Sequence, residues 1–318
     1  MSSRRVIVTG GAGLIGSALT AKLIEQGNQV IVIDNFSSGR REFVHPAAII
    51  IHHDLSFDFP PVATPWDVEA IYHCAAKATN VAEMISQPIV FTINAVIDHH
   101  VFHAAARWNI PLLYCSSSCV YPVTADNPLQ EDDVKDGFDR DSLYGWLKLL
   151  GEQALLSCMP ERCKIVRLFN IYGPHEVPSA TARVIPMLVW KAVKSRNPLK
   201  VWGSGEQFRS FLFVDDAVDA IIAVMERGTP GQPYNVGGPD PVAISEIATA
   251  VADGTGLDVC DIVYEDDIGR PVGIQGRYPD IRRIQHDVGW SSKVTLQSGL
   301  YKTIEWCMSY LEKNTVAL

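Results

Sequence analysis

A glycine-rich turn between a short apolar strand and a helical run constrains the fold of this chain more than any other feature. Residues 4–10 (RRVIVTG) predict a buried strand of β-branched residues, and residues 17–27 (SALTAKLIEQG) predict a helix. Between them, Gly10, Gly13 and Gly16 follow the spacing GxxGxxG. Glycine is needed where a helix must pack closely on the strand before it. This order predicts the first unit of a parallel α/β sheet.

The alternation of strands and helices continues through the first half of the chain. Further strands are predicted at 28–35, 70–76, 111–118 and 163–170, and long helices at 90–109 and 142–159. Strands that alternate with helices are typical of a doubly wound parallel sheet, because each crossover helix must cover one face. The fold class predicted is therefore α/β, with a Rossmann sheet.

The pattern changes after about Tyr172. The stretches that follow are rich in loop-forming residues, apart from a strand and helix predicted at 211–228 and an amphipathic helix near the end. We expect residues 1–172 to form a dinucleotide-binding domain, with 210–236 returning to it. Residues 173–318 are expected to form a smaller mixed lobe that binds the substrate at the carboxyl ends of the strands.

Charge and cysteine usage limit the classes of partner. The net charge of −9 argues against a nucleic-acid or membrane-surface binder, which needs a basic face. No stretch is judged long enough to span a bilayer, and the N-terminus does not resemble a signal peptide. The seven cysteines lack paired spacing, which favours a reducing, cytoplasmic location without a disulfide framework.

The glycine turn predicts a nucleotide cofactor. The free N–H groups at a helix N-terminus suit a pyrophosphate, and Asp34, which ends the second strand, can accept hydrogen bonds from ribose hydroxyls. The charge of Asp34 would repel a 2′-phosphate, which favours NAD over NADP, while Arg40 and Arg41 leave NADP open. The residues expected to bind the cofactor here are Gly10, Gly13, Leu14, Ile15, Gly16, Asp34 and Asn35.

Three residues predict hydride chemistry on a hydroxyl group. Tyr144 and Lys148 lie four apart on a predicted helix and so share one face. A lysine ammonium lowers the pKa of a nearby phenol, and a phenolate can take a proton from a sugar hydroxyl while hydride leaves for NAD. Ser117 follows a predicted strand, at the edge where such sheets place their chemistry, and can hydrogen-bond the same hydroxyl.

Taken together, these motifs resemble the extended short-chain dehydrogenase/reductase family of sugar-nucleotide epimerases and dehydratases. The resemblance rests on TGGAGLIG, the SSS–VY segment, YGWLK, RLFNIYGP and GSGEQFRSFLFVDDAVDAI, and runs from Val6 to about Trp306. It implies Ser117, Tyr144 and Lys148 as catalytic residues and a homodimer formed through the helices that begin near Phe91 and Leu143. Implied cofactor contacts are Asp54 and Leu55 near the adenine, and Ala75, Ala76 and Asn94 along the cofactor path.

The residues after Ser117 bear on the reaction. Dehydratases of the family carry an acidic pair there, whereas this chain has Ser118 and Cys119. A cysteine followed by V-Y-P resembles GDP-mannose 3,5-epimerases and GDP-fucose synthases. A thiol can move a proton at C3 or C5 once C4 is oxidised. We therefore expect an NAD-dependent epimerase that oxidises C4 transiently and inverts C3 or C5 of a GDP-hexose such as GDP-mannose, with Cys119 as acid or base.

Substrate contacts are also implied by the resemblance. VWGSGEQFRSF and GIQGRYPD look like the 3,5-epimerase pattern and imply Arg209 and Arg277 as diphosphate ligands, with Asn170 as a further contact. Arg183 stands where the related groups carry lysine or histidine. Its high pKa suits an orienting or phosphate-binding cation rather than an acid, so His175 is a candidate for the second proton donor.

Other functions remain open. A UDP-sugar 4-epimerase of the UDP-glucose or UDP-glucuronate type needs no second acid or base. An NADPH-dependent 4-keto-sugar epimerase/reductase would consume its cofactor, and a non-catalytic NAD-binding regulator would not need Ser117, Tyr144 and Lys148 together. His99 and His103 are four apart, but without a third ligand they fit a subunit interface better than a metal site. No metal is expected.

Overall fold

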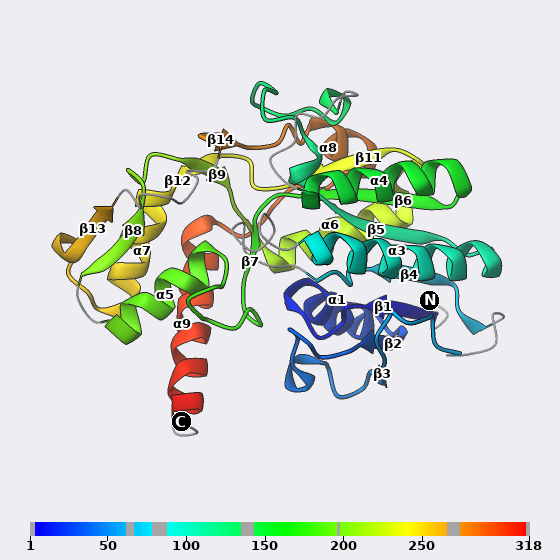
Figure 1. Cartoon of the computed structure of the whole chain (residues 1–318), viewed down its shortest axis with the longest axis horizontal. Helices are drawn as coiled ribbons and strands as arrows, with labels where there is room; N and C mark the ends of the chain where they lie inside the picture. Colours follow the sequence, from blue (N-terminus) through cyan, green and yellow to red (C-terminus); the bar gives the residue numbers. More distant parts are fainter. Residues whose placement is uncertain are drawn as a thin grey trace.

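The computed structural model describes residues 4–61, 67–77, 88–134, 143–195, 198–265 and 274–315. Its main feature is a parallel sheet of seven strands in the order β11-β6-β5-β4-β1-β2-β3 (Figure 1). The strands are β1 (Arg5–Thr9), β2 (Gln29–Asp34), β3 (Ile49–His52), β4 (Ala70–His73), β5 (Leu112–Ser117), β6 (Cys163–Leu168) and β11 (Pro233–Val236). The order reverses between β1 and β4, which is the switch point of a doubly wound sheet. The predicted Rossmann fold is confirmed.

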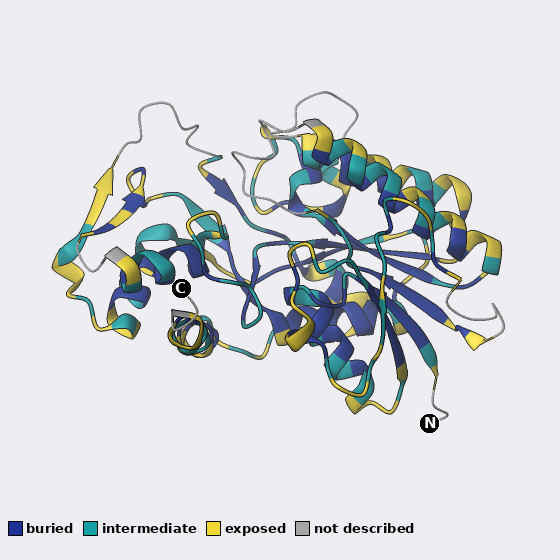
Figure 2. Cartoon of the chain, turned by 60° about the horizontal axis from the view of Figure 1, so that its bottom comes forward, coloured by how far each residue is buried: buried dark blue, intermediate teal, exposed yellow. Residues whose placement is uncertain are grey.

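Helices cover both faces of this sheet. Helices α1 (Leu14–Glu25) and α6 (Val214–Arg227) pack in one layer, and α3 (Pro88–Trp108) and α4 (Leu143–Cys158) in the other. Side chains alternate along each strand, so Val6 and Val8 join the core under α1 and α6 while Ile7 joins the core under α3 and α4. Figure 2 shows the strands buried and the outer turns of the helices exposed. Burial on both faces explains the continuous apolar strands in the sequence.

The smaller lobe combines helices with short strands. Helices α5 (Val184–Ser195), α7 (Ile244–Thr255) and α9 (Leu296–Thr315) pack on one another, and α8 (Arg282–Val288) packs on α6 and β11. Its strand pairs are β8 (Leu199–Trp202) with β13 (Ile262–Glu265), and β9 (Phe208–Ser210) with both β12 (Pro241–Ala243) and β14 (Gly276–Arg277). The pair β7 (Ile171–Tyr172) and β10 (Leu212–Phe213) lies between the lobes (Figure 1). The domain boundary at residue 172 stays a prediction.

Helix α3 corrects one expectation from the sequence. Its segment Ile89–Trp108 has a mean hydropathy of 1.2 and is long and apolar enough to cross a membrane by length and composition alone. The expectation that no stretch reaches this length was wrong. In the structure α3 packs against α4 and β4, with Ile97, Val101 and Ala105 in the core. Its apolar composition therefore has an explanation within the fold.

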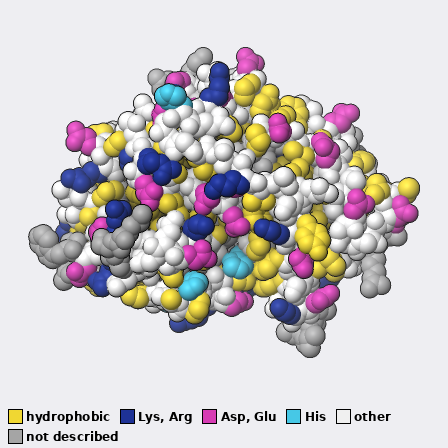
Figure 3. Space-filling model, turned by 180° about the vertical axis from the view of Figure 1, so that it is seen from behind, with side chains coloured by type: hydrophobic (Ala, Val, Ile, Leu, Met, Phe, Trp, Pro, Cys, Tyr) yellow, Lys and Arg dark blue, Asp and Glu magenta, His cyan; other side chains and the backbone are white. Residues whose placement is uncertain are grey.

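The surface charge is locally mixed. On the face shown in Figure 3, Lys and Arg side chains are interspersed with Asp and Glu. Among the described residues, exposed ion pairs include Arg4 with Glu69 and Lys200 with Glu265. Pairs of this kind each contribute little to stability because water screens them. Stability is therefore expected to depend on the two cores and on buried polar contacts.

Candidate active site

The glycine turn between β1 and α1, called here the dinucleotide cradle, has the close packing expected of a dinucleotide site. A Cβ atom on Gly16 would lie 2.1 Å from the carbonyl oxygen of Gly10, so only glycine lets α1 pack this closely on the turn. At Gly13, the N-cap of α1, the nearest atom to such a Cβ would be the same oxygen at 3.6 Å. The protein's own packing therefore leaves space at Gly13, in front of the free N–H groups at Leu14 and Ile15. Helix N-termini bind phosphate groups in this position.

Asp34 is fixed beside this turn. One carboxylate oxygen accepts a hydrogen bond from the backbone N–H of Ala12 at 2.9 Å, and the other accepts from Phe36 at 2.8 Å. Its neighbour Asn35 donates to the carboxylate of Asp54 at 3.0 Å. Hydrogen bonds from Ser56 lower the pKa of Asp54, a second carboxylate beside this turn. Two anions beside the expected ribose fit NAD better than NADP.

The side chain of Leu55, next to Asp54, is buried in the core under α3. Arg40 and Arg41, which left NADP open, have exposed side chains. A hydrogen bond of 2.7 Å joins Nδ1 of His100 on α3 to the carbonyl oxygen of Leu55. The backbone expected near the adenine is therefore tied to helix α3.

The loop after β4 carries the residues that are expected to line the cofactor path. The backbone N–H of Ala75 donates to Oγ1 of Thr9 at 3.3 Å, and Ala76 follows it. The amide oxygen of Asn94 accepts from the N–H of Lys77 at 2.7 Å, and its amide nitrogen donates to the carbonyl of Lys77 at 3.1 Å. Both ends of the Asn94 amide are therefore occupied by the loop. In this structure Asn94 acts on the cofactor path by holding the loop backbone.

The three expected catalytic residues come from two neighbouring elements. Ser117 ends β5, and its Oγ accepts a hydrogen bond of 3.2 Å from the N–H of Cys119, which caps the short helix η3 (Ser118–Val120). Helix α4 packs on η3, and a Cβ on Gly145 would lie 2.1 Å from the carbonyl oxygen of Cys119. Glycine at 145 therefore lets the first turn of α4 lie directly on η3. This contact brings Tyr144 next to the segment that carries Ser117 and Cys119.

Burial sets the electrostatics of Tyr144 and Lys148. Lys148 is 3% exposed, and its Nζ lies 5.9 Å from the ring centroid of Tyr144. Burial raises the pKa of Tyr144, and the charge of Lys148 offsets only part of that rise. Lys148 therefore lowers the pKa of this phenol as expected, but not below the ordinary value. Burial also opposes the charge of Lys148, but Tyr144 and Asp98 raise its pKa above the ordinary value.

A buried polar chain that the sequence analysis did not single out lies behind Lys148. It consists of Thr9, His73, Asp98 and Tyr114, and Nζ of Lys148 lies 4.4 Å from the ring centroid of Tyr114. The sequence signal was available, since Asp98 falls on the face of α3 that also carries Asn94, Val101 and Ala105. A carboxylate on a buried helix face is rare unless it has partners.

The two arginines expected to bind diphosphate are neighbours. Arg209 on β9 and Arg277 on β14 are direct partners in a parallel pair, so their side chains leave the same face of the small sheet. One Arg209 nitrogen donates to the carbonyl of Phe208 at 2.8 Å, and Arg277 is 6% exposed. Two adjacent guanidinium groups can each present paired donors to phosphate oxygens. The residues lie 68 positions apart, so only the fold brings them together.

The other expected substrate residues have protein partners. The amide of Asn170 donates to the carbonyl of Ser210 at 2.9 Å, next to Arg209. Arg183 donates to Glu176 at 2.7 Å and to the carbonyl of Ile171 at 3.2 Å, and its charge also acts on Tyr144. Asn170 and Arg183 are therefore held at the junction of the two lobes.

His175 packs against the start of α1 and against Phe43. Its Nδ1 is 2.9 Å from Oγ of Ser17, and its ring stacks on Phe43 at 4.6 Å. Burial lowers the pKa of His175. These contacts favour a structural role at the start of α1 over the role of second proton donor.

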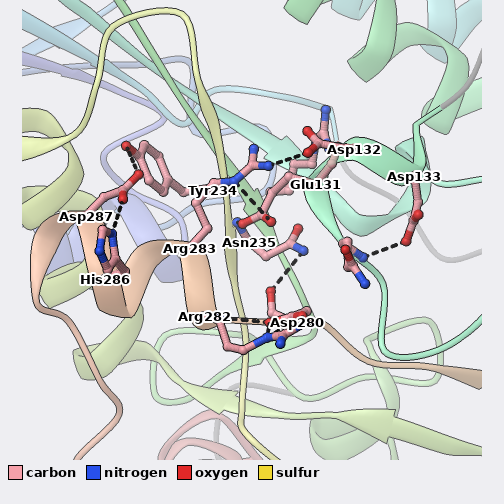
Figure 4. A network of polar contacts seen from close by, with 12 residues as sticks. Glu131, Asp132, Asp133, Tyr234, Asn235, Asp280, Arg282, Arg283, His286 and Asp287 are labelled. Carbon is pink, nitrogen blue, oxygen red and sulfur yellow. Dashed lines mark hydrogen bonds and ion pairs between the residues drawn. The ribbon is translucent and has the colours of Figure 1, made fainter.

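A polar network holds the strand that carries Arg277 against the large sheet (Figure 4). The backbone N–H of Asn235 on β11 donates to Glu131 at 2.9 Å, and its amide donates to the carbonyls of Leu129 and Asp280. Arg283 on α8 pairs with Glu131 and Asp132. These contacts tie the segment 129–132 and the residues that follow β14 to β11, which helps to hold Arg277 in place relative to the large sheet.

His99 and His103 lie on the exposed side of α3 with ring centroids 6.1 Å apart. Among the described residues, no group of three or more His, Cys, Asp or Glu side chains is placed to hold a metal ion. The assignment of the pair to a subunit interface and the expected dimer both stay predictions.

Comparison with known proteins identifies the family. Residues 6–237 match the family described as "NAD dependent epimerase/dehydratase family". The chain belongs to this family. It is 30% identical to UDP-glucuronic acid decarboxylase 1 of Xenopus tropicalis over 97% of this chain and 73% of that protein. It is 29% identical to UDP-glucose 4-epimerase of Mycolicibacterium smegmatis over 95% of this chain and 98% of that protein.

The solved structures agree with this family assignment. The structure of UDP-glucose 4-epimerase from Thermotoga maritima, solved with UDP-glucose, matches with a TM-score of 0.85 and 25% identity, over 96% of this chain and 99% of that one. This epimerase/dehydratase family member therefore uses NAD, and the three relatives named here are enzymes of UDP-sugars. The finer resemblance to GDP-mannose 3,5-epimerases receives no specific support, since all three of these relatives carry UDP-sugar names.

Proposed function

We propose that this family member is a redox-neutral epimerase that inverts C4 of a UDP-sugar. The observation that carries the proposal is the convergence of Ser117, Tyr144 and Lys148 at the carboxyl edge of β5, beside the dinucleotide cradle. The UDP-sugar names of relatives that align over nearly the whole chain favour a UDP-sugar over the GDP-hexose expected from the sequence. A 4-epimerase also needs no second acid or base, which agrees with the structural contacts of His175.

The proposed mechanism assigns one task to each side chain. Bound NAD supplies the acceptor and later the donor of the C4 hydride. Tyr144 takes the proton of the C4 hydroxyl and returns it, Ser117 hydrogen-bonds that hydroxyl, and Lys148 stabilises the phenolate. Arg209 and Arg277 hold the diphosphate, which is remote from the reacting carbon. Because the anchor is remote, the sugar ring can turn over between the two hydride transfers while the nucleotide stays bound.

Turnover of UDP-sugars in heavy water tests this proposal. We expect UDP-glucose and UDP-galactose to interconvert without net change at the nicotinamide absorbance band and without deuterium at the inverted carbon, because the hydride returns from the cofactor. Nuclear magnetic resonance of the products reads both outcomes. Release of carbon dioxide from UDP-glucuronate, or stoichiometric consumption of NADPH, would instead assign the chain to a decarboxylase or a reductase.

A second candidate, inversion at C3 or C5, is favoured by one specific observation. The Cys119 thiol is half-buried, and the carbonyl oxygen of Cys119 packs against Gly145, the neighbour of Tyr144. If it moves a substrate proton, Cys119→Ser should lower epimerisation by about 10²-fold or more with NAD still bound. It should also abolish deuterium incorporation with a GDP-hexose such as GDP-mannose.

The control for this prediction is Cys158→Ser, an exposed position at the end of α4, which should leave turnover unchanged. Full activity of Cys119→Ser on every sugar would show that Cys119 only packs against Gly145.

A further inference from the structure

We propose that Asp98 is a positioning residue, the buried counter-ion that keeps Lys148 charged and oriented beside Tyr144. The inference rests on the proposed function only in assigning Tyr144 and Lys148 as the catalytic pair. Asp98 comes from α3, whereas Tyr144 and Lys148 come from α4 in the same layer. Its side chain is 7% exposed, so its charge has no access to bulk water that would screen it.

The hydrogen bonds of Asp98 suit an ionised carboxylate. Oδ2 accepts from the hydroxyl of Tyr114 at 2.7 Å, and Oδ1 lies 3.0 Å from Nε2 of His73. Burial alone would raise the pKa of Asp98, but the charge of Lys148 and these two bonds lower it below its ordinary value. Burial lowers the pKa of His73. A neutral imidazole facing a carboxylate carries its proton on Nε2 and donates it.

The remaining bonds of this chain reach the cofactor path. With its proton on Nε2, His73 accepts at Nδ1 from Oγ1 of Thr9 at 2.7 Å, and Thr9 in turn accepts from the N–H of Ala75 at 3.3 Å. The direction of every hydrogen bond from Ala75 to Asp98 is therefore set by the carboxylate. Asp98 thus links the loop that lines the cofactor path to the ring of Tyr114, over which Lys148 lies.

Lys148 is enclosed by groups from every neighbouring element. Tyr144 faces it from its own helix, Asp98 from α3, His73 and Cys74 from β4 and its end, and Tyr114 and Cys115 from β5. Sγ of Cys74 and Sγ of Cys115 lie 3.6 Å apart and share a hydrogen bond between two free thiols. Burial and bonding raise the pKa of Cys74 and of Tyr114. Asp98 is the carboxylate in this set, and a buried ammonium without an anion tends to lose its proton.

Removing the charge of Asp98 should shift the pKa values of both Tyr144 and Lys148 in a known direction. While Lys148 stays protonated, a nearby anion favours its ammonium and disfavours the phenolate of Tyr144, so the anion raises both pKa values. Asp98→Asn keeps the shape of the side chain and should therefore lower both. The acidic limb of the pH–rate profile, set by Tyr144, and the alkaline limb, set by Lys148, should both move to lower pH. Loss of packing alone would lower the rate without moving the limbs.

The test is the pKa of Tyr144 in the NAD-bound enzyme, measured by carbon-13 resonance of ring-labelled tyrosine and assigned by its absence in Tyr144→Phe. Asp98→Asn should lower this pKa by about one unit. Tyr114→Phe, which keeps the carboxylate and removes one hydrogen bond, should shift it much less. An unchanged Tyr144 pKa in Asp98→Asn, or an equal shift in Tyr114→Phe, overturns the inference.

Two further measurements keep the test decisive. Asp98→Ser, a smaller neutral side chain, replaces Asp98→Asn if the latter does not fold, and the same downward shift is expected. The resonance titration needs no substrate. If no UDP-sugar turns over, the proposed function fails while the role of Asp98 is still decided by the titration. If UDP-sugars turn over and both limbs of the profile stay in place in Asp98→Asn, the role of Asp98 fails alone.

Discussion

Tyr144→Phe is expected to lower turnover by about 10²–10⁴-fold while NAD stays bound, because the variant loses the proton acceptor for the C4 hydroxyl and little else. The phenylalanine ring fills the same buried space, so α4 should still pack on η3 through Gly145. Turnover of UDP-glucose gives the rate, and the nicotinamide absorbance of the purified protein gives cofactor content. Activity should rise with pH through the pKa of Tyr144, since the phenolate is the active form.

A matched control is available on the surface. Tyr301 on α9 is 67% exposed, and Tyr301→Phe should leave both turnover and bound NAD unchanged. If Tyr144→Phe kept its rate within about threefold of the original, the phenol would not be the proton acceptor, because general acid–base catalysis is worth far more than that.

Arg167→Met is expected to produce the largest loss of stability, about 3–5 kcal/mol, because it leaves a carboxylate buried without its partner. Arg167 is buried and donates to Glu152 through two nitrogens, at 3.0 and 2.7 Å. A third nitrogen donates to the hydroxyl of Tyr121 and to the carbonyl of Glu131. Glu152 is 1% exposed and also accepts from Ser116, next to Ser117. Urea unfolding of the purified variant measures the loss.

Two comparisons separate the buried charge from packing. The double variant Arg167→Met with Glu152→Met should be less destabilised than the sum of the single variants, because no unpaired charge remains. Arg282, whose side chain is 78% exposed, pairs with Asp280, and Arg282→Met should change stability by less than about 1 kcal/mol. A loss for Arg167→Met as small as that for Arg282→Met would show that water reaches Glu152.

The large sheet could be predicted because its signals are local. The apolar strand, glycine turn and helix at 4–27 lie within one stretch of chain, and the structure places β1 and α1 there. Strand β3 was missed, since Ile49–His52 is short, partly exposed and gains its strand conformation by pairing with β2. In the smaller lobe, β9 has three residues and β14 has two. Pairing between distant segments forms these strands, and no periodicity marks them.

The residues of the candidate site also divide into those with local sequence signals and those that only the fold brings together. Ser117, Tyr144 and Lys148 carry local signals, namely the end of a strand and a spacing of four on a helix. The resemblance implied Arg209 and Arg277, but their adjacency depends on the pairing of β9 with β14. Asp98 escaped notice because the sequence of α3 reads as an apolar helix, and its partners His73 and Tyr114 lie on two other elements. The role of a buried charge depends on its partners, and only the fold brings those partners together.

Strand β11 has a consequence for how the chain reaches this fold. It pairs with β6 although 64 residues separate the two strands in the sequence, and α6 covers the same part of the sheet. A polypeptide that ended at Tyr172 would leave β6 as an open edge and Val166 and Leu113 without the cover of α6. During synthesis, the large sheet can therefore be completed only after β11 has been made, and β11 follows α5 and β8–β10 in the chain. Exposed edges of this kind invite aggregation, so truncation before Val236 should give insoluble protein rather than a smaller NAD-binding domain.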